Sequence, residues 1–198
     1  MTLAELRAAF LARLNRSDCD AALADSFLGE GMRRVQRELR APFMERVHWV
    51  DARTQPIESI EIPADYIEAI EVLCGGQPLT REPFRSLMRV PAAGCPGLWG
   101  RYRNTLYFRG AIPTGKRVEL LYYGNFSALP SDASANELTA SAPDLLIYGS
   151  LSVAGDHFEH DKRAEWEARY TSILAQVSDQ AERDEIAGGP MAIQPAYY

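Results

Sequence analysis

The residues best suited to chemistry form a cluster of aspartates and histidines, which reads Asp156-His157-x-x-His160-Asp161. Side chains three and four positions apart share one face of a helix, so this cluster could present several ligands together. Such a set could hold a metal ion for hydrolysis, with the carboxylate of Glu165 as the nearby general base. The sequence lacks an H-E-x-x-H pattern, and the alternative is that these groups cap helix ends and face solvent. A metal-dependent hydrolase is therefore the enzyme hypothesis.

Other catalytic patterns are absent from the sequence. His48 stands beside Trp49 with no nucleophile motif nearby, which favours an ordinary strand residue. Neither a phosphate-binding G-x-x-x-x-G-K-[ST] loop nor a G-x-G-x-x-G dinucleotide motif occurs. The cysteines Cys19, Cys74 and Cys95 are odd in number and far apart, which favours reduced thiols over disulfides or a zinc site. We expect no catalytic residue, no resident metal and no cofactor.

The charge balance argues against a nucleic-acid-binding protein. The chain has 198 residues, a formal net charge of −6 and a pI of about 5.2, so its surface repels phosphates. The best basic cluster is a stripe of four arginines on a predicted helix: Arg33, Arg34, Arg37 and Arg40. The alternative is a solvated or subunit-facing stripe, and we take Arg33 and Arg37 as candidates for subunit contacts. The sequence contains neither a membrane-spanning run nor a secretory signal, so we expect synthesis in the cytoplasm.

Helices are predicted at both ends of the chain. Near the N-terminus Thr2 and Glu5 form a capping box, and apolar residues then recur at helical spacing up to a stop at Pro42. A turn at residues 15–18 divides this region into an αα-hairpin. Near the C-terminus Ser141 is a candidate cap, with Pro143 in the first turn.

The C-terminal helical region contains two apolar stripes. Residues 147, 151, 154 and 158 form one stripe, whereas Trp166 and Tyr170 begin another that is rotated by roughly 100°. One straight helix cannot bury both stripes against a single partner, so we expect a break near residues 157–162. Trp166 and Tyr170 are either core residues or a surface kept for a neighbouring subunit.

Between the helical regions, short β-branched and aromatic runs predict strands. They occupy residues 43–50, 57–62, 66–74, 98–103, 105–109 and 117–123. The Gly75-Gly76 pair predicts a tight hairpin after the third run, and residues 83–90 predict one or two helical turns. Residues 127–140 are polar and predict a loop.

The fold class predicted by these patterns is α+β: a helical bundle with an inserted small antiparallel β unit and an extended C-terminal tail. The bundle comprises the N-terminal αα-hairpin (residues 1–41) and long C-terminal helices (residues 141–187), and the β insert covers residues 43–126. Residues 1–187 then form a single domain, and residues 188–198 form the tail.

The tail has the composition of a docking peptide. It follows a Gly188-Gly189 hinge and carries these prolines, apolar residues and tyrosines: Pro190, Met191, Ile193, Pro195, Tyr197 and Tyr198. Aromatic side chains are common anchors of binding peptides. Extended, the tail could reach roughly 30 Å to a sheet edge or groove on another protein. The alternative is a disordered end.

The C-terminal helices resemble those of tailed-bacteriophage head-to-tail adaptor proteins, also called connector or head completion proteins. The resemblance rests on A-P-D-L-L-I-Y-G-S-L, F-E-H-D-K-R and W-E-A-R-Y between Ala142 and Tyr170. Weaker likeness occurs in I-P-A-D-Y (residues 62–66), L-Y-F-R-G (residues 106–110) and V-E-L-L-Y-Y (residues 118–123). Gly155 and His157 depart from the family, which is more alanine-rich and apolar at these positions.

The resemblance implies a structural virion protein rather than an enzyme. Its subunits would form a twelvefold ring that joins the portal of the capsid to the tail, with double-stranded DNA passing through the central channel. Its partners would be the portal protein, which residues 190–198 would contact, and a tail protein or second adaptor. The protein would lie at the head–tail junction of the virion and contact no membrane. The alternative is a hydrolase, for example a cell-wall-acting virion enzyme, that uses the Asp156–Asp161 cluster.

Overall fold

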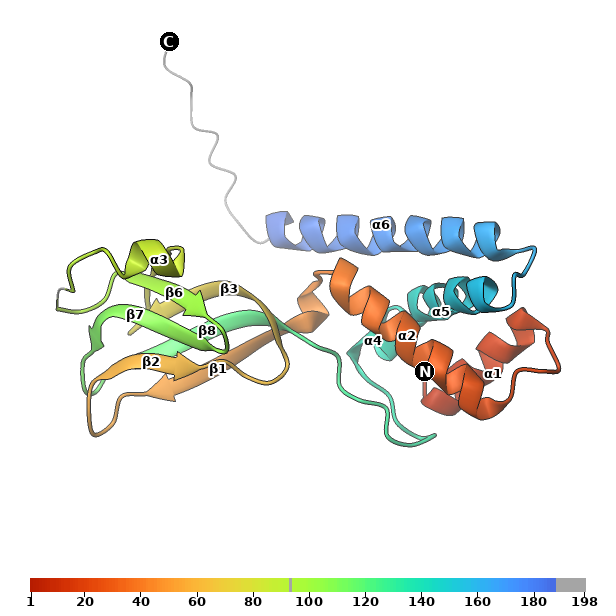
Figure 1. The fold of residues 1–198 in the computed structure, drawn as a ribbon, viewed down its shortest axis with the longest axis horizontal. Helices are drawn as coiled ribbons and strands as arrows, with labels where there is room; N and C mark the ends of the chain where they lie inside the picture. The colour runs from red at the N-terminus through yellow and green to blue at the C-terminus, as the bar shows by residue number, and fades with distance from the viewer. Residues whose placement is uncertain (93, 188–198) are drawn as a thin grey trace, which may run out of the picture. The chain divides into compact units, whose positions relative to one another are not determined.

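The computed structural model describes residues 1–92 and 94–187, and the chain divides into two compact units (Figure 1). Unit 1 contains residues 1–43 and the chain from Phe126 onward, and its described elements are helical. Unit 2 is Met44–Asn125, which forms strands and one short helix. No helix in the described part of the chain is long and apolar enough to cross a membrane.

The first two helices begin at side-chain caps. Helix α1 spans Leu3–Leu14, and the predicted capping box is confirmed: Thr2 Oγ1 accepts from the Glu5 amide, and the Glu5 carboxylate accepts from the Thr2 amide. Helix α2 spans Ala21–Glu38 and begins after Asp20, whose carboxylate accepts from the Leu23 amide at 2.8 Å. A 3-10 turn, η1 (Pro42–Met44), follows it.

Three helices make up the C-terminal part of unit 1: α4 (Glu137–Ser141), α5 (Pro143–His157) and α6 (Arg163–Ala187). The break expected near residues 157–162 is confirmed, since α5 ends and α6 begins around it. The expected cap at Ser141 is wrong because this residue ends α4, and α5 begins at Pro143 without a side-chain cap. Helix α4 also occupies part of the predicted loop at residues 127–140.

Helix α5 is the central element of unit 1. It is buried on most of its circumference, and it packs against α1, α2 and α6. Glycines permit the close approach: a Cβ atom at Gly31 of α2 would lie 2.8 Å from the backbone nitrogen of Ser150. A Cβ atom at Gly149 would lie 3.0 Å from the ring of Tyr170 on α6. Both distances are shorter than an ordinary van der Waals contact, so larger residues at these positions would push the helices apart.

Unit 2 consists of two four-stranded sheets. Sheet A has the order β1-β8-β3-β4, formed by Glu45–Asp51, Arg117–Gly124, Tyr66–Cys74 and Gln77–Pro78. Sheet B has the order β2-β7-β6-β5, formed by Ile57–Glu61, Thr105–Ile112, Leu98–Tyr102 and Thr80–Arg81. The short helix α3 (Phe84–Leu87) packs on β6. The predicted Gly75-Gly76 hairpin is confirmed, because Cys74 pairs with Gln77 across it.

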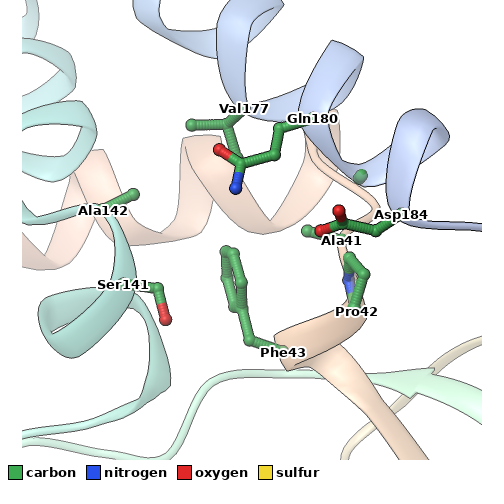
Figure 2. Close-up of a pocket in the computed structure, with 9 residues that line it drawn as sticks. Ala41, Pro42, Phe43, Ser141, Ala142, Val177, Gln180 and Asp184 are labelled. Carbon is green, nitrogen blue, oxygen red and sulfur yellow. The ribbon is translucent and has the colours of Figure 1, made fainter. Parts of the chain in front are cut away.

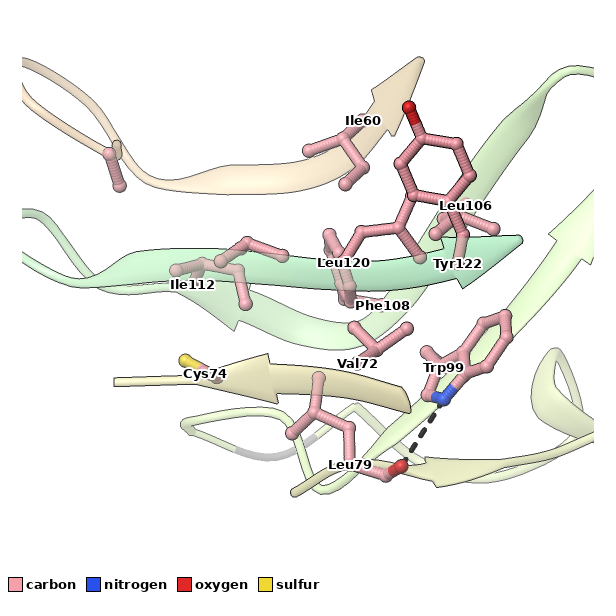
Figure 3. Close-up of a cluster of buried hydrophobic side chains, with 12 residues drawn as sticks. Ile60, Val72, Cys74, Leu79, Trp99, Leu106, Phe108, Ile112, Leu120 and Tyr122 are labelled. Carbon is pink, nitrogen blue, oxygen red and sulfur yellow. Dashed lines mark hydrogen bonds between the residues drawn. The ribbon is translucent and has the colours of Figure 1, made fainter. Parts of the chain in front are cut away.

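The two sheets share one hydrophobic core (Figure 3). Val72 and Leu120 of sheet A, together with Leu106 and Phe108 of sheet B, are buried in the same cluster. The indole of Trp99 lies at the end of this cluster and donates a hydrogen bond to the Leu79 carbonyl at 3.2 Å. Since both sheets bury one face in this core, their other faces point in opposite directions.

The predicted helical bundle with a small antiparallel β insert is wrong. Helix α2 packs mainly on α5 and only slightly on α1, so the N-terminal helices do not form a separate hairpin. The β region forms two sheets over its own core, and β5 and β6 pair in parallel. The chain crosses between the sheets several times: β1, β3, β4 and β8 belong to sheet A, whereas β2, β5, β6 and β7 belong to sheet B. Short apolar runs predict strands but not this distribution.

Candidate functional site

The histidines of the Asp156–Asp161 cluster pack against aromatic rings. The ring centroid of His157 lies 5.4 Å from that of Phe27, and the centroid of His160 lies 4.6 Å from that of Trp166. His160 Nδ1 also accepts a hydrogen bond from the Lys162 amide at 3.1 Å. The two histidines therefore contribute to packing at the α5–α6 break instead of converging on one point.

The nearby carboxylates bind arginines. Asp156 forms an ion pair of 2.8 Å with Arg163, and Glu165 forms one of 2.8 Å with Arg169. Over residues 1–92 and 94–187, no group of three or more His, Cys, Asp or Glu side chains is placed to hold a metal ion. The arrangement gives the hydrolase hypothesis no geometric support.

Trp166 and Tyr170 lie in the core of unit 1, which is one of the two interpretations that the sequence left open. They are only 4% and 1% exposed, respectively. The Tyr170 hydroxyl donates a hydrogen bond of 2.6 Å to Glu38, and burial together with this bond raises the pKa of the phenol. A role for both residues in subunit contacts stays a prediction. Because both side chains are buried, such a role would be indirect, through the position in which they hold α6.

Arg34 is the centre of a polar network that joins the helices. Its guanidinium donates to both carboxylate oxygens of Glu167 on α6, at 2.8 and 2.6 Å, and forms a 3.2 Å ion pair with Glu38. Ser152 of α5 donates to the same Glu167 carboxylate at 2.5 Å. The hydrogen bonds from Arg34 are the main cause that lowers the pKa of Glu167 to about 2.

The four arginines of α2 and its C-terminal end therefore do not form one basic patch. Arg34 is committed to α6, and Arg40 donates to the carbonyls of Gln36 and Leu39. Arg33 and Arg37 are exposed, and neither forms a hydrogen bond or ion pair with another described residue. These two side chains remain available to a partner, as the sequence led us to expect, but their role stays a prediction.

Unit 1 contains a pocket of about 300 Å³ beside the C-terminal part of α6 (Figure 2). Phe43, Ala142 and Val177 give it apolar walls, while Gln180 and Asp184 add polar groups. The ring of Phe43 points into the pocket toward Val177, and Phe43 also stacks on Phe126 with centroids 6.2 Å apart. The predicted docking tail, with Pro190, Met191, Ile193, Pro195, Tyr197 and Tyr198, lies outside the described residues.

Unit 2 has an apolar surface that the sequence does not predict, and we call it the Trp49 face. It is the outer face of sheet A and contains Val47, Trp49, Glu71 and Glu119, with Ile70 at an adjoining β-bulge. Trp49 is 59% exposed, although a tryptophan is usually well buried. The alternation along β1 does not predict this exposure: Val47 and Trp49 belong to its more apolar set, yet the half-buried set is Arg46, His48 and Val50.

A second missed surface lies on the outer side of sheet B, and we call it the α3 face. Helix α3 packs directly over Gly100 of β6, where a Cβ atom would lie 2.8 Å from the Glu82 carbonyl. Phe84 stacks on Tyr102 with centroids 4.8 Å apart, and Arg85, Met88 and Arg89 are exposed. The sequence predicted the helical turns but gave no sign that they cover a sheet.

Comparison with known proteins identifies the family of the chain. No curated protein matches it. A family model described as SU10 adaptor protein matches residues 1–194, which leaves Tyr197 and Tyr198 beyond the matched region. The match includes both units and the Ala142–Tyr170 segment on which the resemblance to phage head-to-tail adaptors rests. The chain therefore belongs to the SU10 adaptor protein family, a family of phage adaptor proteins.

Proposed function

We propose that this adaptor forms a twelvefold ring that joins the portal of a phage capsid to the tail, with double-stranded DNA passing through its centre. The observation that carries the proposal is the family match over residues 1–194. An adaptor acts by contacts rather than by catalysis, and the helix network around Arg34 is suited to this role because it fixes α2 and α6 to α5.

Charge supports the DNA-channel part of the proposal. A wall that bound phosphate strongly would slow DNA passage, and the net charge of −6 disfavours such binding. Several arginines of unit 1 bind carboxylates of the same chain and are therefore partly neutralised, among them Arg7, Arg16, Arg34, Arg163 and Arg169.

Assembly on the portal is the direct test of the proposal. The purified chain is mixed with the portal ring of its own phage, and the complex is weighed by native mass spectrometry. We expect a mass equal to one portal ring plus twelve copies of the chain. A portal ring that gains no mass, or gains one or two copies, contradicts the proposal.

The proposal assigns portal contact to the tail residues Pro190, Met191, Ile193, Pro195, Tyr197 and Tyr198. A chain that ends at Gly189 should fold normally, as measured by circular dichroism, but bind the portal more weakly. The variant Tyr197→Ser/Tyr198→Ser keeps the length of the tail and tests the aromatic anchors separately. A variant with a scrambled tail of the same composition is the control for non-specific binding to the portal. Unchanged binding of the truncated chain would remove the docking role.

A further inference from the structure

We infer that neighbouring copies of this chain contact each other head to tail through unit 2, with the Trp49 face of one copy seated on the α3 face of the next. The inference rests on the proposed ring and names the surfaces that build it. It follows from the exposure, the charges and the opposite orientation of the two faces.

The Trp49 face has the composition of an interface core. Val47 and Trp49 are adjacent on the same side of β1, and Ile70 on β3 is also exposed. Leu121 of β8 pairs directly with Val47, so the apolar side chains are contiguous across the strands. Exposed clusters of this kind mark interaction sites, and tryptophan is among the residues most enriched at binding hot spots.

The charges around Trp49 are mainly negative. Glu45, Glu71 and Glu119 lie on the same face of sheet A, and none forms an ion pair with another described residue. The basic residue of this face is Arg117, whose guanidinium lies 6.0 Å from the centroid of the Trp49 ring. It shares Asp51 with Arg53 and interacts electrostatically with Glu119, so the three glutamates still outnumber it. A partner for this face should combine apolar side chains with unpaired positive charges.

The α3 face meets this requirement. Met88 is 53% exposed and Tyr102 is 47% exposed. Arg85 and Arg89 are exposed next to them, and neither side chain has an ion-pair partner among the described residues. Glu82 is the acidic neighbour, and it is outnumbered by the arginines around it. The other acidic side chains of sheet B, Glu58 and Glu61, lie on the edge strand β2, and β7 separates this strand from β6.

The orientation of the two faces suits a closed ring. They lie on the outer sides of two sheets that share one core, and they therefore point in opposite directions. A heterologous contact between unlike faces propagates from copy to copy and closes if each step rotates by the correct angle. Twelve copies require a rotation of about 30° per step, so the two contact surfaces of each copy must be nearly opposite.

Photo-crosslinking in the portal-bound complex tests the contact. A photoreactive benzoylphenylalanine replaces Trp49, which is largely exposed, so the substitution removes little core packing. We expect crosslinks between copies to join position 49 to peptides within residues 82–103 of the neighbour. Crosslinks that join position 49 to another region, or none in a complex of correct mass, overturn the inference and leave the proposed ring intact. An unmodified chain that adds no ring to the portal overturns the proposed function instead.

A pair of blocking variants provides a second test. Trp49→Ala/Glu119→Arg disables the Trp49 face, and Arg85→Glu/Arg89→Glu disables the α3 face. We expect each variant alone to lose ring formation on the portal. A crosslinked equimolar mixture should yield dimers that contain one copy of each variant, because each variant keeps one intact face. The control Asp179→Arg, a charge reversal at an exposed position of α6, should leave the ring intact. Full rings from either blocking variant would refute the contact.

Discussion

Arg34 of α2 donates two hydrogen bonds to the carboxylate of Glu167 on α6, at 2.8 and 2.6 Å, and its guanidinium lies 4.0 Å from the centroid of the Tyr170 ring. Arg34 and Glu167 are 133 positions apart in sequence, so this pair fixes the first part of unit 1 to the last. Bidentate geometry orients both side chains, which an ordinary surface ion pair does not do.

The substitution Glu167→Gln should lower the free energy of unfolding by about 1–2 kcal/mol, since it removes a charge-assisted pair from a half-buried position. Urea unfolding followed by circular dichroism measures the change. The control Glu165→Gln removes a carboxylate from the exposed i,i+4 pair with Arg169 and should cost less than about 0.5 kcal/mol. Equal losses in the two variants would contradict the special role of the Arg34 pair.

The same pair predicts a pH dependence. Because the folded-state pKa of Glu167 is lowered to about 2 from an ordinary value of 4.5, the folded chain releases this proton more readily than the unfolded chain. The stabilisation is complete above pH 4.5 and is lost as the pH falls toward 2. The difference in unfolding free energy between wild type and Glu167→Gln should therefore shrink on acidification across this window. A difference that stays constant from pH 7 to pH 3 would disprove the assignment.

Replacing either of two glycines of α2 by alanine should change stability, but in opposite directions. Gly31→Ala should destabilise unit 1 by about 1–3 kcal/mol, because the new Cβ atom would lie 2.8 Å from the Ser150 nitrogen. Gly29→Ala should stabilise the helix by about 0.5–1 kcal/mol, since its nearest neighbour is the flexible end of Arg33 at 3.6 Å. Thermal unfolding of both variants measures the contrast. The same sign for both would show that α2 and α5 pack less closely than described.

The local elements of this protein were predictable from its sequence, whereas their assembly was not. The Thr2–Glu5 capping box, the break after His157 and the Gly75-Gly76 hairpin depend on neighbouring residues, and the structure confirms all three. The partition of strands between two sheets depends on long-range pairing, for example between Trp49 and Glu119. No local pattern contains that information, so the β region was expected to be a small insert.

The candidate sites also depend on long-range packing that local sequence patterns do not contain. The helical spacing leaves open whether Trp166 and Tyr170 are core residues or a subunit surface, and the structure shows that both are buried. Conversely, the sequence does not single out Trp49, yet it is the most exposed of the large hydrophobic residues with described side chains. Periodicity shows that a residue is apolar, but burial depends on which sheet covers it.

Unit 2 should fold without unit 1. It has its own core, and its ends meet because Glu45 of β1 pairs with Tyr123 of β8. A polypeptide of residues 44–125 should therefore show a β-sheet circular dichroism spectrum and a cooperative thermal transition. The variant Leu106→Ala in the same polypeptide should lower stability by about 2–5 kcal/mol or prevent folding, since this side chain is fully buried. A random-coil spectrum for the unmodified polypeptide would contradict the independence of the unit.

The three cysteines should differ in reactivity. Cys95 is exposed, whereas Cys19 and Cys74 are buried, and desolvation raises the pKa of both buried thiols. Iodoacetamide applied to the native protein at pH 7.5, followed by peptide mass spectrometry, should modify Cys95 at least tenfold faster than the others. Denaturation should remove the difference. Rapid native labelling of Cys74 would show that the core of unit 2 is more open than described.

The central claim, that this chain is a ring-forming adaptor, is tested most directly by cryo-electron microscopy of the chain bound to its portal. The account predicts a closed ring of twelve copies that is coaxial with the portal and encloses a channel wide enough for double-stranded DNA. A twofold assembly, an open filament or a portal without added density would contradict it.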